Sequence, residues 1–184
     1  MVMQMMTRVA LALALLGGVA VAKPATGSRA IVDRPVAIVG GQPIWKSEID
    51  DTLRAAKADP SPDVFQRVLD DLIDQRLMVL AAVAENLTAN DAEIAAGIQQ
   101  VEQANNIADT GLDTALADLG MTRAQFRAEL AKQITIQKLI RHELVPKISV
   151  PASGDQIELQ MQLENERRKW LEARKRSVHI ERLQ

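Results

Sequence analysis

Residues 35–45 read PVAIVGGQPIW, and this stretch decides the fold of the chain. Two short apolar runs flank the pair Gly40-Gly41, and glycine accepts the positive φ that a two-residue hairpin turn requires. The stretch therefore predicts a β-hairpin over residues 34–46. Pro43 has no N–H to donate to a neighbouring strand, so we expect the second strand to lie at a sheet edge.

The end of the chain predicts a strand that can pair with this hairpin. Residues 177–183 read SVHIERL, in which Val178 and Ile180 alternate with His179 and Glu181 in the pattern of a half-buried strand. The segments in between favour helices. The predicted fold class is therefore mainly α, with a small antiparallel sheet formed by the N-terminal hairpin and the C-terminal strand.

Helical patterns cover residues 47–148. Ser47 and the pair Ser61-Pro62 are typical of helix starts. After Pro62 an apolar stripe with 3–4 spacing continues for about six turns, and Arg76 falls inside it. The stripe comprises Val64, Phe65, Val68, Leu69, Leu72, Ile73, Arg76, Leu77, Leu80 and Ala81, and the opposite face, predicted to be solvated, carries Asp70, Asp71, Asp74 and Gln75.

The strongest local signal lies at residues 121–126, MTRAQF. Thr122 and Gln125 have the spacing of a capping box, and Met121 and Phe126 occupy the two positions of a hydrophobic staple. They predict a helix that continues to about Leu144, followed by a break around residues 149–154. Residues 155–176 then predict a long, charge-rich closing helix. We expect structural roles for Trp45, Thr122, Gln125, Trp170, Val178 and Ile180, with the two tryptophans joining the hairpin to the closing helix.

Composition removes many kinds of site. The 184 residues include no cysteine, which excludes a disulfide scaffold, a thiolate zinc site and a cysteine nucleophile. The net charge of −2 disfavours nucleic-acid binding through a basic surface. His142 and His179 lie far apart in sequence, and no Gly-x-Ser-x-Gly motif surrounds a serine. We therefore expect no catalytic residue, no metal site, no cofactor and no enzymatic activity.

The first 22 residues have the pattern of a secretory signal peptide. One positive charge at Arg8 precedes the uncharged run Val9–Ala22, which ends in the small-x-small sequence Ala20-Val21-Ala22. As a helix, this run spans about 21 Å, less than the roughly 30 Å of a bilayer core. We expect cleavage after Ala22, with an uncleaved anchor as the alternative. Residues 23–33 then form a flexible leader, and residues 34–184 a single domain without stable membrane insertion.

Several stretches together resemble SurA-type periplasmic chaperones. VDRPVAIVGGQPIWKSEID is similar to the family's opening strand–turn–strand–helix motif, and VLDDLIDQRLMVLAAVAENL to its second helix. The order of elements in QANNIADTGLDTALADLGMTRAQFRAELAKQITIQKLIRHELVPKI also matches. WLEARKRSVHIERL is similar to the family's closing Trp-led helix and strand. The resemblance covers about residues 33–183.

The resemblance implies an ATP-independent periplasmic chaperone that binds unfolded outer-membrane or secreted polypeptides in an apolar cleft. Typical members insert parvulin-type prolyl isomerase domains before the closing helix, and each needs about 100 residues. Here Asp155 follows Ile148 after only six intervening residues. The resemblance therefore implies the chaperone module without isomerase activity. An adaptor that docks on one dedicated partner in envelope assembly is the alternative, and the oligomeric state stays open.

Client polypeptides need an exposed apolar patch. The candidates are Leu112, Leu116, Leu119, Met121 and Phe126, because a short helix between two breaks often lies over the rim of a core. Ordinary core packing is the competing interpretation, since apolar residues at helical spacing usually face inward. Export also makes DNA an improbable partner for the basic run in residues 167–176, which we interpret as a solvated helix face.

Overall fold

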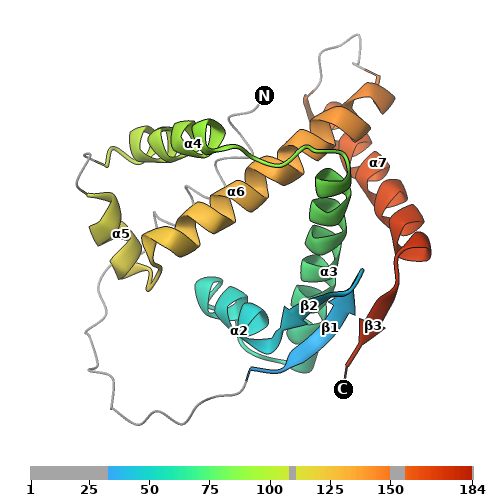
Figure 1. The fold of residues 1–184 in the computed structure, drawn as a ribbon, viewed down its shortest axis with the longest axis horizontal. Helices are drawn as coiled ribbons and strands as arrows, with labels where there is room; N and C mark the ends of the chain where they lie inside the picture. Colours follow the sequence, from blue (N-terminus) through green and yellow to red (C-terminus); the bar gives the residue numbers. More distant parts are fainter. Residues whose placement is uncertain (1–32, 108–110, 150–155, 184) are drawn as a thin grey trace.

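The hairpin forms where the sequence predicts it. In the computed structural model, which describes residues 33–107, 111–149 and 156–183, strand β1 is Pro35–Val39 and strand β2 is Gln42–Trp45 (Figure 1). Gly40 and Gly41 connect them with φ of +56° and +80°, the left-handed conformation that the turn requires. The predicted signal peptide and its cleavage site at Ala22, and the leader up to residue 32, lie outside the described residues.

A third strand completes the sheet. Strand β3, Ile180–Arg182, pairs antiparallel with β1, so that Ala37 lies opposite Arg182 and Val39 opposite Ile180. The strand order β2-β1-β3 leaves β2 at an edge, where Pro43 was expected. The predicted fold class is confirmed. The strand is shorter than predicted because the preceding helix continues through Ser177.

Helices make up the rest of the described chain (Figure 1). They are α2 Lys46–Ala55, α3 Pro62–Ala84, α4 Asp91–Ala104, α5 Leu112–Asp118, α6 Arg123–Leu139 and α7 Gln156–Ser177. A π-helix, η1 Ile140–Leu144, and a 3-10 helix, η2 Val145–Lys147, follow α6. We predicted a regular helix up to Leu144. The structure instead ends this segment in a π-turn, in which Ile140 and Leu144 are buried, just before Pro146, which cannot continue the ladder.

The helix starts agree with the predicted caps at Ser61 and Thr122 and disagree at Ser47. Ser61 caps α3 by accepting from the Val64 N–H, and Asn90 and Thr122 cap α4 and α6 through capping boxes. Ser47 is not a cap, so that expectation is wrong. Strand β2 runs directly into α2, Trp45 becomes the N-cap residue, and Ser47 hydrogen-bonds to the Asp33 carboxylate.

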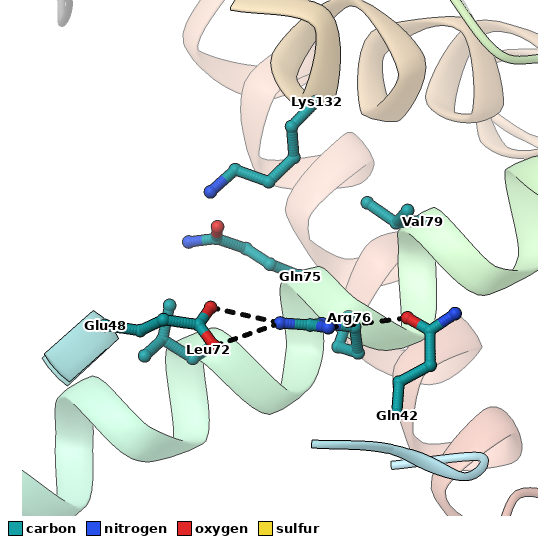
Figure 2. A pocket seen from close by; sticks show the side chains of 7 residues that line it. All are labelled: Gln42, Glu48, Leu72, Gln75, Arg76, Val79 and Lys132. Atoms are coloured by element: carbon teal, nitrogen blue, oxygen red, sulfur yellow. Dashed lines mark hydrogen bonds and ion pairs between the residues drawn. The ribbon is translucent and has the colours of Figure 1, made fainter. Parts of the chain in front are cut away.

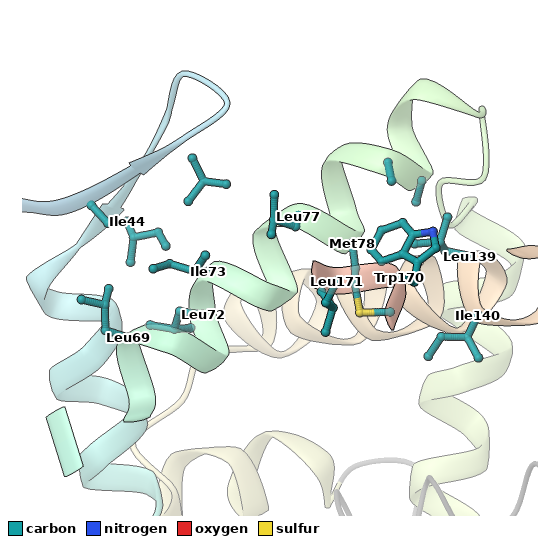
Figure 3. Packing of buried hydrophobic residues seen from close by; sticks show 14 of the residues in the cluster. Ile44, Leu69, Leu72, Ile73, Leu77, Met78, Leu139, Ile140, Trp170 and Leu171 are labelled. Carbon is teal, nitrogen blue, oxygen red and sulfur yellow. The ribbon is translucent and has the colours of Figure 1, made fainter. Parts of the chain in front are cut away.

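The described residues form two hydrophobic clusters, and the larger one, which we call the main core, surrounds α3. Its buried residues come from β1, β2, α2, α3, the end of α6, η1 and α7. Trp170 of α7 is 9% exposed and packs against Met78 and Leu139 (Figure 3). Val178 and Ile180 pack against the same cluster. The closing helix α7 and strand β3 therefore pack against the hairpin and α3.

A second cluster, which we call the arm, lies toward the N-terminal end of α6. Its buried side chains come from α4, α5 and α6: Ile94, Val101, Leu112, Leu116, Phe126 and Leu130. Figure 1 shows α4 and α5 beside this part of α6, away from the sheet. Helix α6 contributes to both clusters, since Leu139 belongs to the main core. It therefore connects the arm to the rest of the molecule.

The position of Trp45 corrects one expectation. Its side chain is 38% exposed and is not among the residues of the main core. Because Trp45 ends β2 and caps α2 at the sheet edge, it does not join the hairpin to the closing helix, and only Trp170 is buried.

In the described part of the chain, no helix is both long and apolar enough to cross a bilayer.

Candidate functional site

A groove of about 220 Å³ lies where α3, α6 and the hairpin approach one another. It is lined by Gln42 of β2, Glu48 of α2, Leu72, Gln75, Arg76 and Val79 of α3, and Lys132 of α6. The hairpin, α2, α3 and α6 therefore all contribute to a single hollow (Figure 2). A more open hollow of about 470 Å³ lies beside α4 and is lined only by that helix and the loop after it.

An ion pair forms one wall of the groove. The guanidinium of Arg76 donates to both carboxylate oxygens of Glu48, at 3.0 and 3.4 Å, and to Gln42 Oε1 at 3.4 Å (Figure 2). Arg76 and Glu48 keep 24% and 34% of their side-chain surface exposed, so the pair remains in contact with solvent. The ion pair links the start of α2 to the middle of α3.

Lys132 and Gln75 line the side of the groove toward α6. Lys132 extends from α6 toward Gln75 of α3 (Figure 2). The Lys132 amine pairs with Glu129 on its own helix at 2.6 Å. Within the described part of the chain, the Gln75 amide has no hydrogen-bond partner. An amide offers both a donor and an acceptor, so Gln75 can bind a peptide backbone that enters the groove.

The lining is mixed rather than apolar. Five of the seven residues are polar or charged, and Leu72 and Val79 supply the apolar contacts. The apolar cleft stays a prediction, and in this groove polar side chains surround the two apolar ones. The signal available in the sequence was Arg76, a charge inside the apolar stripe of α3, which indicates that part of the stripe faces a polar partner.

The predicted client-binding residues lie mostly in the interior of the arm. Leu112, Leu116 and Phe126 are 1%, 2% and 6% exposed. Met121 is half-buried against the same cluster, and Leu119 is half-buried as well. Because α5 packs its apolar side onto α6, the three buried side chains fill the arm and are not at the surface. A role in binding clients stays a prediction, which this structure narrows to Leu119 and Met121.

The predicted structural residues are placed as follows. The Thr122 hydroxyl accepts from the Gln125 N–H at 3.2 Å, and Gln125 Oε1 accepts from the Thr122 N–H at 2.8 Å, which together cap α6. Trp170 lies in the main core, and Val178 and Ile180 pack on it. Arg174 lies over the Trp170 ring, 5.1 Å from its centroid. The burial of Trp170 and the packing of Val178 and Ile180 hold the closing helix and strand against the main core.

Polar contacts join the α3–α4 loop and the start of α4 to α6. The Lys138 amine donates to the Thr88 carbonyl at 2.9 Å and to Glu93 Oε2 at 3.0 Å, and the Ala89 N–H donates to Thr135 Oγ1 at 3.0 Å. The hydrogen bond from the Asn90 N–H is the largest cause that lowers the pKa of the Glu93 carboxyl below its ordinary value of 4.5, and the hydrogen bond from the Lys138 amine is the next largest.

The comparisons with known proteins agree on one family. A family model described as the SurA-like N-terminal domain matches residues 1–140. A protein named Chaperone SurA from Cupriavidus metallidurans is 32% identical over 129 residues, which cover 65% of this chain and 26% of the relative. One of the same name from Chromobacterium violaceum is 31% identical over 156 residues, which cover 80% of this chain and 36% of the relative. The chain thus spans about a quarter to a third of these relatives.

Proposed function

Because the chain belongs to the SurA-like N-terminal domain family, we propose that it is an ATP-independent periplasmic chaperone for unfolded polypeptides. Its clients are outer-membrane or secreted proteins in extended or partly folded states. The name Chaperone SurA, shared by its relatives, supports the chaperone role. The signal-peptide pattern supports export, with removal of residues 1–22 after Ala22 and a single domain over residues 34–184.

The groove between α3 and α6 is the observation that carries this proposal. At about 220 Å³ it is smaller than the roughly 300–1,000 Å³ of a typical small-molecule site, so it suits a few side chains of a longer segment. The Gln75 amide and the Gln42 amide NH2 bind the backbone of an extended client. Leu72 and Val79 contact apolar client side chains, whose burial supplies the attraction.

Holding of this kind requires no chemistry. A client segment leaves the groove when its own folding buries the apolar side chains that the groove had contacted, so release needs no ATP. The short connection between η2 and α7 leaves no room for an inserted isomerase domain, which supports a chaperone without prolyl isomerase activity. We therefore propose that the chain acts through binding alone.

Light scattering tests the chaperone function. An unfolded outer-membrane β-barrel protein is diluted from urea into buffer, with the purified chain and, separately, with an inert protein of similar size. We expect near-stoichiometric amounts of the chain to suppress aggregation, while the inert protein does not. Unchanged scattering across a wide excess would overturn general holding and favour an adaptor with one dedicated partner.

A pair of tryptophan variants tests the groove itself. Gln75→Trp fills the hollow from a half-buried position, whereas Gln100→Trp places the same ring on an exposed position of α4. If clients occupy the groove, Gln75→Trp lowers suppression of aggregation several-fold and Gln100→Trp leaves it unchanged. Equal activity of both variants would place client binding elsewhere without removing the chaperone function. Thermal unfolding of both variants serves as the control for folding.

A further inference from the structure

We propose that Glu85, His142 and Glu143 form a binding site for a divalent transition-metal ion, with Zn²⁺ as the best fit. Glu85 is the C-cap residue of α3, and the other two residues lie in η1. Each residue offers one ligand atom, and the three atoms lie within 4.8 Å of one another. The sequence suggested no such site, because its two histidines are far apart. The carboxylates that join His142 come from a different helix and from the next residue.

The distances match the edges of a tetrahedral zinc site. The His142 Nδ1 atom lies 3.3 Å from Glu85 Oε2 and 3.6 Å from Glu143 Oε1. Zinc bonds to imidazole nitrogen and carboxylate oxygen are about 2.0–2.2 Å long, so two ligand atoms of a tetrahedron lie about 3.3–3.6 Å apart. Both distances fall in that range. Zn²⁺ can therefore bind between these atoms with only small side-chain movements.

The carboxylates are oriented by cations on their far sides. Arg174 of α7 lies 3.8 Å from Glu85 Oε1, and Lys147 lies 3.4 Å from Glu143 Oε2. In each case the cation faces the oxygen that does not face His142. Partners of this kind, which hold a ligand in the binding orientation, are typical around metal ions. Each carboxylate therefore has one oxygen beside a cation and the other beside His142.

One of the ligand atoms is buried without a hydrogen bond. Within the described part of the chain, Glu85 Oε2 has no hydrogen-bond partner, although less than 1 Å² of it is exposed. Its near neighbour is His142 Nδ1 at 3.3 Å, and a metal ion between the two atoms would stabilise this shielded carboxylate oxygen. The His142 side chain is 61% exposed, which leaves a fourth coordination position open to water. The arrangement is that of three protein ligands and one open position.

The π-turn explains how neighbouring residues can share one ion. A π-helix has more residues per turn than an α-helix, so consecutive side chains diverge by a smaller angle. His142 and Glu143 can therefore both face the end of α3. A bound ion would link α3 to η1 beside α7, where the main core ends. It would stabilise this corner, because an ion that binds the folded state preferentially raises its stability.

Zinc alone is the probe that tests the proposal. The purified chain, freed of metal with a chelator, is titrated with Zn²⁺ by calorimetry, and its melting temperature is recorded with and without the ion. We expect one saturable equivalent of zinc and a higher melting temperature. His142→Gln and Glu85→Gln are expected to abolish both effects. His179→Gln, which changes the other histidine on an exposed position, is expected to retain them.

A second measurement on the unaltered chain is independent of how the variants fold. Zinc is expected to shift the imidazole NMR signals of His142 and to leave those of His179 in place. Absence of saturable binding, binding that persists in His142→Gln, or equal shifts of both histidines would overturn the site. In the absence of a site, the His142 imidazole simply lies beside the two carboxylates.

Discussion

Gly40 shows how closely the hairpin approaches α3. A Cβ added there would lie 2.9 Å from Leu80 Cδ1 and 3.4 Å from Val178 Cγ1, and φ is +56°. At Gly41, φ is +80° but no atom lies within 4 Å of the added Cβ. Both Gly→Ala variants pay about 1–2 kcal/mol for the left-handed backbone. We expect Gly40→Ala to lose more stability than Gly41→Ala in urea unfolding, and equal losses would contradict the packing against Leu80.

Glu93 predicts a dependence of stability on pH. The hydrogen bonds from the Asn90 N–H and from Lys138 lower the pKa of its carboxyl in the folded state. Its stabilising contribution is therefore present above the ordinary value of 4.5 and is lost as the pH falls below it. Glu93→Gln should be less stable than the parent chain at neutral pH, and the difference should shrink as the pH falls below 4.5. A difference that stays constant with pH would show that the charge is not responsible.

Helix α6 contributes to both clusters, and its first turn is held by the capping box at Thr122. Thr122→Ala removes the hydroxyl that accepts from the Gln125 N–H, and losing such a cap costs about 1 kcal/mol. We expect that loss of free energy of unfolding in chemical denaturation. Thr114→Ala, on an exposed position of α5, serves as the matched control and should change stability little. Equal effects of the two variants would show that the capping box is unimportant.

The elements were largely predictable because their signals are local. The Gly-Gly turn, the caps at Ser61 and Thr122 and the alternation of Val178 and Ile180 each depend on residues close in sequence. The groove was not predictable, because it forms between elements: Gln75 looked like a solvated residue, yet it lines the hollow together with Lys132. The π-turn also depends on packing against α3 and α7, which no local pattern encodes.

At the scale of the whole molecule, the closing strand joins the two ends of the domain. Beyond its ladder with β1, the Leu183 N–H donates to the Val36 carbonyl, and Arg182 pairs with Asp70 of α3. Deleting residues 177–184 should expose the β1 edge and the surface around Trp170. We expect a melting temperature lower by many degrees. Arg182→Gln removes only the exposed contacts to Asp70 and Gln66 and should have a small effect. An unchanged melting temperature for the deletion would contradict the topology.

Site-specific cross-linking tests the central claim most directly. Because the chain has no cysteine, Gln75→Cys and Gln100→Cys each carry a single photoreactive maleimide label without further changes. Each labelled chain is mixed with an unfolded outer-membrane protein and irradiated. We expect strong cross-links from position 75 in the groove and weak ones from position 100 on α4. Equal cross-linking from both positions, or stronger cross-linking from position 100, would contradict client binding in the groove.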